Sequence, residues 1–83
     1  MISIALASYN GEKYILDQLE SFASQSKIPD EVIISDDCSN DNTIKLIKQF
    51  AKSAPFRVEI YQNETNLGYA QNFNNALSKT NGD

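Results

Sequence analysis

The 83-residue sequence contains no histidine, a single cysteine, three glycines and no long apolar run. Without histidine it cannot form a Ser-His-Asp triad, an HExxH zinc site or the zinc site of a nucleobase deaminase. Gly11, Gly68 and Gly82 are too far apart for a GxGxxG fingerprint or a Walker A phosphate loop. These absences exclude the histidine-dependent hydrolases and the two best-known glycine-rich nucleotide-binding loops.

Charge and cysteine content narrow the possible partners and the compartment. The formal net charge is −4 and the pI is near 4.6, which argues against binding to nucleic acid or to anionic lipid. Cys38 has no second cysteine to pair with, and the first residues have neither the basic segment nor the apolar length of a signal peptide. We therefore expect a cytoplasmic protein, which in its full-length form could lie at the inner face of the membrane.

Apolar patterning predicts strands and helices in alternation. Strands are predicted over residues 2–8, 31–35 and 56–61. Helices are predicted over residues 12–25, after Asp41 as N-cap, and from Tyr69 to about Asn81–Gly82. Right-handed crossovers of helix length give a parallel sheet covered on its faces. The sequence thus predicts an α/β fold, a three-layer Rossmann-like β-α-β-α-β-α half with strand order 3-2-1.

Polar and aromatic residues follow each predicted strand. They are Ser8, Tyr9 and Asn10 after the first, Asp36 and Asp37 after the second, and Gln62 and Asn63 after the third. Ligands of doubly wound folds bind beyond the carboxyl ends of the strands. A ligand cleft is therefore predicted at this end of the sheet.

The Asp36-Asp37 pair is the most informative feature of this cleft. Aspartate also favours turns and helix starts, so a purely local role is the alternative interpretation. A fixed carboxylate could instead accept a hydrogen bond from the N3–H of uracil or thymine, a donor that cytosine lacks. Tyr9 could offer a face for base stacking, although a half-buried tyrosine with its hydroxyl in water is the simpler alternative.

Several segments, in the same order along the chain, resemble family 2 glycosyltransferases. They are the strand with its Tyr-Asn-Gly turn (residues 4–14), the Leu-x-Ser helix end (19–26), the Asp-Asp segment (31–43), and the landmarks Asn66-Leu67-Gly68, Asn72 and Gly82-Asp83. The stretch from Asn72 to Leu77 is most similar to bacterial rhamnosyltransferases.

The resemblance implies a GT-A fold and a UDP- or dTDP-sugar donor, with transfer by inversion to a glycan or lipid-linked acceptor. It implies that residues 1–83 are the amino-terminal nucleotide-sugar-binding part, ending before the strand whose Asp-x-Asp element holds Mn²⁺ or Mg²⁺. The catalytic base would lie further on. We therefore assign no catalytic and no metal-ligating residue within the 83 residues.

The same resemblance implies the residues of the nucleotide site. By position, Tyr9 would stack on the base, Asp37 would contact its N3–H, and Asp36 would support the loop and the ribose side. Ala7 and Ser8 would line the pocket through their backbone. The nucleotide site implied by the resemblance also includes Asn66 and Gly68.

One position departs from the family pattern. Cys38 stands where the family usually has glycine, so a turn with positive φ at that position would cost about 1 kcal/mol.

Two other interpretations of the whole chain remain open. The first is a receiver-like regulatory module, although receivers place an aspartate after the third strand, where this chain has Tyr61-Gln62-Asn63. The second is a non-catalytic remnant. If the chain belongs to the glycosyltransferase family, we expect residues 1–83 alone to be inactive and to self-associate through an open edge of the first strand.

Overall fold

Three strands and three helices alternate along the chain in this computed structural model, which describes residues 2–80. They are β1 (Ser3–Ser8), α1 (Ile15–Ala23), β2 (Glu31–Asp36), α2 (Thr43–Ala51), β3 (Arg57–Gln62) and α3 (Tyr69–Ser78). The strands agree with the sequence-based prediction to within one residue at each end. The helices are shorter than predicted, and the predicted helix end at Asn81–Gly82 lies outside the described residues.

Local hydrogen bonds explain where two of the helices begin. Before α1, the backbone N–H groups of Tyr14 and Ile15 both donate to the carbonyl of Gly11, which closes a turn over the residues expected to be helical. Asp41 is not the N-cap of α2, because Asn42 immediately precedes the helix. The Asp41 carboxylate nevertheless accepts a hydrogen bond from the Thr43 N–H at 3.0 Å. It therefore satisfies a donor of the first helical turn, although it lies one residue before the N-cap.

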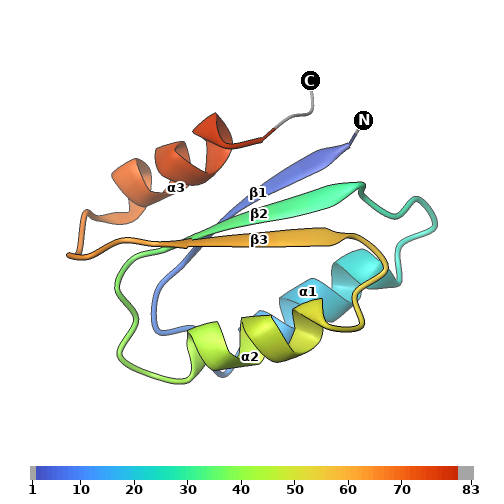
Figure 1. The fold of residues 1–83 in the computed structure, drawn as a ribbon, viewed down its shortest axis with the longest axis horizontal. Helices are drawn as coiled ribbons and strands as arrows, with labels where there is room; N and C mark the ends of the chain where they lie inside the picture. Colours follow the sequence, from blue (N-terminus) through green and yellow to red (C-terminus); the bar gives the residue numbers. More distant parts are fainter. Residues whose placement is uncertain (1, 81–83) are drawn as a thin grey trace.

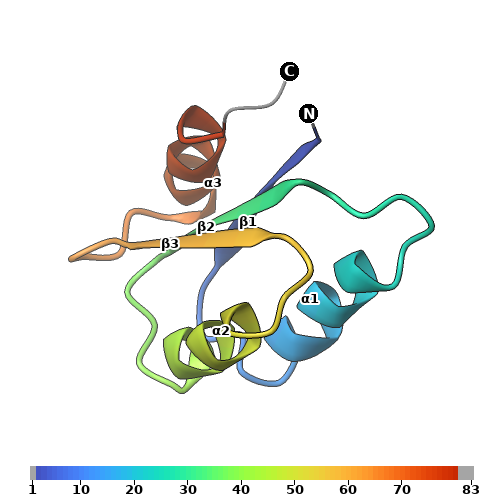
Figure 2. The ribbon, with the colours of Figure 1, turned by 45° about the vertical axis from the view of Figure 1, so that its right-hand side comes forward.

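The three strands form one parallel sheet in the order β1-β2-β3, which confirms the predicted order 3-2-1. Ser3 pairs with Glu31, and Glu31 with Arg57, so the strands start and end in register. Helices α1 and α2 lie on one face of the sheet and α3 lies on the other (Figures 1 and 2). The predicted three-layer α/β arrangement is therefore confirmed.

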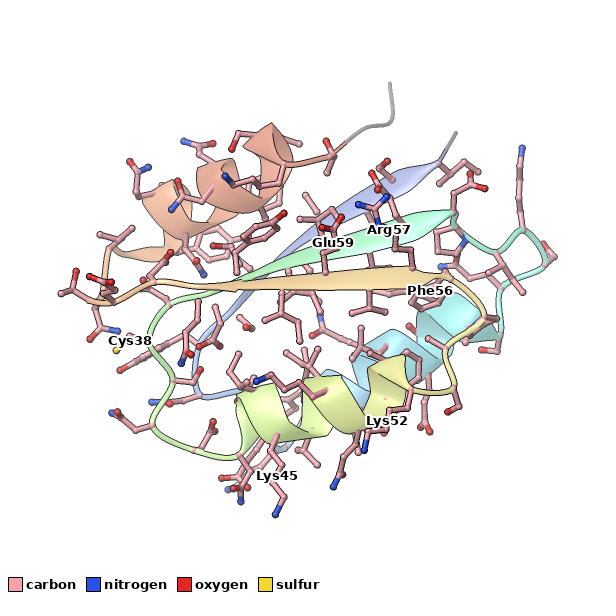
Figure 3. The ribbon with its side chains drawn as sticks, in the orientation of Figure 1. Cys38, Lys45, Lys52, Phe56, Arg57 and Glu59 are labelled. Carbon is pink, nitrogen blue, oxygen red and sulfur yellow. The ribbon has the colours of Figure 1, made fainter. Side chains whose placement is uncertain are left out.

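The main core lies between the sheet and the α1–α2 layer. All six residues of β2 are buried, because this strand has a neighbour on each side and helices on both faces. Val32 and Ile34 of β2 pack with residues of α1 and α2, chiefly Ile15, Leu19 and Ile47. Phe56, labelled in Figure 3, closes the far end of this layer against Phe50, with ring centroids 5.9 Å apart.

Small residues let α3 approach the other face of the sheet. Ile4 and Leu6 point into the main core, so Ala5 and Ala7 point toward α3 by strand alternation. From the helix, only Asn72 and Ala76 are buried. The first turn of α3 therefore lies close to the carboxyl end of β1, where the ligand cleft was predicted.

The outer edge of β1 is expected to make residues 1–83 self-associate. No other strand within residues 2–80 pairs with this edge, and Ser3–Ser8 carries neither charge nor proline to block added strands. We expect a polypeptide of residues 1–83, made by itself, to grow in apparent mass with concentration in light scattering. A monomer of constant size over the whole concentration range would contradict the expectation that the outer edge of β1 can pair with another strand.

Candidate functional site

A cavity of about 510 Å³ opens at the carboxyl end of the sheet, on the α3 side. It is lined by Ala7, Ser8, Tyr9, Asp37, Asn66, Gly68, Tyr69 and Asn72. The ends of β1 and β2 supply one part of this wall, and the loop after β3 with the first turn of α3 supplies the rest. The structure thus brings together every residue predicted for the nucleotide site except Asp36.

Asp36 is fully buried and holds the loop after β2 rather than lining the cavity. Its Oδ1 accepts from the hydroxyls of Ser8 at 2.7 Å and Ser39 at 2.6 Å, and its Oδ2 accepts from the Ser39 N–H at 2.8 Å. The expected support of the loop fits these contacts. A direct contact with a ribose does not fit them, because both oxygens face inward to protein donors.

Asp37 is 5% exposed, and its carboxylate accepts hydrogen bonds from three donor groups. Its Oδ1 accepts from the Leu67 N–H at 2.7 Å and from Asn63 Nδ2 at 3.0 Å, and its Oδ2 accepts from the Gly68 N–H at 3.0 Å. The Leu67 N–H contributes most to lowering the pKa of Asp37, and Asn63, Gly68 and Asn66 add to it against the opposing effect of burial. The carboxylate is therefore ionised at neutral pH.

The same carboxylate fixes the start of α3. Gly68, with φ at 91°, precedes the helix and has no side chain to satisfy the donors there. Asp37 accepts these donors from across the sheet end, and Asn66 Nδ2 donates to the Asp37 carbonyl at 2.6 Å. A carboxylate offers about four acceptor positions, so these three bonds leave one position, on Oδ2, unfilled in a residue that lines the cavity.

Tyr9 forms an exposed aromatic wall of the cavity, with 53% of its surface accessible. The turn that carries it is fixed by contacts of Asn10, which has φ at 47°. The Asn10 N–H donates to Ser39 Oγ, and its Oδ1 accepts from the Asn40 N–H, both at 2.8 Å. The loops after β1 and β2 thus hold Tyr9 beside Asp37.

Tyr69 and Asn72 line the cavity but were not predicted as site residues. Tyr69 is 78% exposed, and its ring lies nearly parallel to that of Phe73, at 6.3 Å. Residues 69, 72 and 76 share one helix face by their spacing. Asn72 is one of the landmarks of the family resemblance, and that was the signal in the sequence that could have been used.

Cys38 has the positive φ, 60°, that the family pattern of glycine at this position anticipated. Its side chain lies at the same end of the sheet as the loop after β3, with Sγ 3.6 Å from the Glu64 carbonyl oxygen (Figure 3). A non-glycine residue is therefore held in the left-handed region next to Asp37.

Residues 2–80 contain neither a metal-binding cluster of side chains nor a membrane-spanning helix. Within residues 2–80, no three His, Cys, Asp or Glu side chains come close enough together to hold a metal ion. The Mn²⁺ or Mg²⁺ site that the family resemblance implies was expected on a later strand, outside these residues. No helix in this part of the chain is long and apolar enough to cross a membrane.

Comparison with known proteins shows the family of the chain. Residues 3–83 match the family model described as Glycosyl transferase family 2, so the chain belongs to that family. It is 37% identical to EpsE of Bacillus subtilis over 82 residues, covering 99% of this chain and 30% of that protein. It is 38% identical to the dTDP-rhamnosyl transferase RfbG of Shigella flexneri over 65 residues, 78% of this chain and 22% of that protein.

A solved structure shares the fold. The crystal structure of Staphylococcus aureus TarS residues 1–349 in complex with UDP superposes with a TM-score of 0.84 at 34% identity, covering 96% of this chain and 24% of that chain. The described residues are therefore half of a GT-A fold, as predicted. The chain spans less than a third of the length of these proteins.

The strained turn at Cys38 can be tested by substitution. We expect Cys38→Gly to raise the free energy of unfolding by up to about 1 kcal/mol, because glycine adopts positive φ without steric cost. Cys38→Ala is the matched control, since it keeps Cβ and should bring no gain. Thermal unfolding of both variants measures the difference, and equal or lower stability of Cys38→Gly than of Cys38→Ala would contradict a strained Cys38.

Proposed function

We propose that the cavity binds the base of a UDP- or dTDP-sugar donor in a glycosyltransferase. The observation that carries the proposal is the one acceptor position left on Asp37 Oδ2, beside the exposed ring of Tyr9. Uracil and thymine both present an N3–H donor to such an acceptor, whereas cytosine presents a lone pair. A volume of about 510 Å³ is in the range of small-ligand sites.

The comparisons support this choice of donor. TarS has been solved with UDP and with UDP-GlcNAc, and RfbG is named for a dTDP-linked donor. UDP and dTDP differ at the base C5 position and at the ribose 2′ position, and both keep the N3–H that we assign to Asp37. The same contact with Asp37 therefore serves for UDP and for dTDP.

The reaction of the complete protein follows the family expectation. An acceptor hydroxyl on a glycan or lipid-linked molecule would attack the donor sugar carbon with inversion, while the nucleoside diphosphate leaves. Mn²⁺ or Mg²⁺ remains an expectation for that protein, as does a cytoplasmic location. Because we assign no catalytic base within residues 1–83, we expect these residues alone to transfer no sugar.

Substitution of Asp37 tests the base contact. In the complete protein, we expect UDP and dTDP to bind more tightly than CDP. Asp37→Asn should weaken UDP binding about ten- to a hundredfold, the effect of losing a hydrogen bond to a charged group. Isothermal titration calorimetry measures both effects.

The control is Asp17→Asn, the same change on the exposed face of α1. It removes the same charge and should leave UDP binding unchanged. Equal affinity of the unsubstituted protein for UDP and CDP would overturn the proposed contact.

A further inference from the structure

We infer that Asn63 is a positioning residue for base recognition, whose side-chain amide, oriented by Asn72, holds the Asp37 carboxylate as a hydrogen bond acceptor. The inference deepens the proposed function and rests on it. Asn63 does not line the cavity, and it lies outside the segments that resemble the family motifs. Its position directly after β3 places it beside the last residues of β2 and the first turn of α3.

The contacts form a continuous path across the site. Asn72, which is 2% exposed, donates through Nδ2 to the Ser8 carbonyl at 3.2 Å. Asn63 Nδ2 donates to Asn72 Oδ1 at 2.9 Å and to Asp37 Oδ1 at 3.0 Å. Polar groups from β1, α3, the end of β3 and the end of β2 are therefore linked in that order.

The direction of this path is set by its first member. A backbone carbonyl can only accept, so Asn72 must turn its NH₂ group toward Ser8 and its oxygen toward Asn63. Asn63 must then present its own NH₂ group to that oxygen, and the second N–H of the same group points to Asp37 Oδ1. Both amide orientations thus follow from the Ser8 carbonyl.

The orientation of the Asn63 amide determines which acceptor positions of the Asp37 carboxylate are filled. Together with the Leu67 N–H, Asn63 fills both acceptor positions of Oδ1, and the Gly68 N–H takes one position of Oδ2, so a single position on Oδ2 remains. Each of these donors stabilises the ionised carboxylate, which disfavours protonation of Asp37, in line with its lowered pKa. An ionised Asp37 cannot donate to cytosine N3, so the path from Ser8, by stabilising the ionised carboxylate, favours uracil or thymine.

The titratable side chains that surround Asp37 come from three elements. Tyr9 follows β1, Asp36 and Cys38 flank Asp37 after β2, and Tyr69 begins α3. Of these, only Asp36 is a second carboxyl group, and its oxygens accept from Ser8 and Ser39 instead. A change in the titration of Asp37 on substitution of Asn63 therefore reports the contact between these two side chains.

The experiment uses the complete protein with Asn63→Leu, which keeps approximate size but has no donor. Asn74→Leu, on the exposed face of α3, is the matched control. Binding of UDP and of CDP is measured by calorimetry, and the Asp37 carboxyl is titrated by NMR. We expect Asn63→Leu to reduce the preference for UDP over CDP about tenfold and to raise the pKa of Asp37, with Asn74→Leu unchanged in both.

The outcomes separate the inference from the proposed function. If the unsubstituted protein shows no preference for UDP over CDP, the proposed function and the inference that rests on it both fail. If it prefers UDP and Asn63→Leu keeps that preference and the titration of Asp37, only the inference is overturned. Should Asn63→Leu not fold, Asn63→Ala decides: it also lacks a donor, so an unchanged preference and titration overturn the inference, and a reduced preference with a raised pKa of Asp37 supports it.

Discussion

The hydrogen bonds that the Asp37 carboxylate accepts from the loop after β3 are the contacts on which the site depends. Helix α3 buries only Asn72 and Ala76, so apolar packing alone gives it a small attachment to the sheet. Gly68 at its start brings no capping side chain. Asp37 supplies that missing acceptor through the N–H groups of Leu67 and Gly68. The carboxylate that shapes the cavity thereby also fixes the helix that forms its other wall.

Two adjacent aspartates perform separate tasks because successive side chains of a strand point to opposite faces. Asp36 points toward the α1–α2 side, where Ser8 and Ser39 use both of its oxygens and tie together the loops after β1 and β2. Asp37 points toward the α3 side and keeps one acceptor position. The rigidity supplied by the first aspartate holds Tyr9 and the second aspartate in place, so the site is formed before a ligand arrives.

The sequence predicted the layout of the fold because its strongest patterns are local. Strand β2 is apolar on both faces and ends in two aspartates, which is typical of a central parallel strand that leads into a ligand site. The partners of Asp36 and Asn72 could not be predicted from such patterns. Whether Asp36 faces a cavity depends on the serines it meets, and the bond from Asn72 to the Ser8 carbonyl joins residues 64 positions apart. The late start of α1 depended on a turn at Gly11 that apolar periodicity does not record.

The most direct measurement is a crystal structure of the complete protein with UDP bound. We expect the uracil ring to lie against Tyr9, with its N3 within hydrogen-bond distance, about 2.7–3.2 Å, of Asp37 Oδ2. The bonds from Leu67, Gly68 and Asn63 to the carboxylate should remain in that complex. A uracil whose N3–H donates to water or to a backbone carbonyl, with Asp37 bound only to protein donors, would contradict the central claim that this carboxylate reads the base.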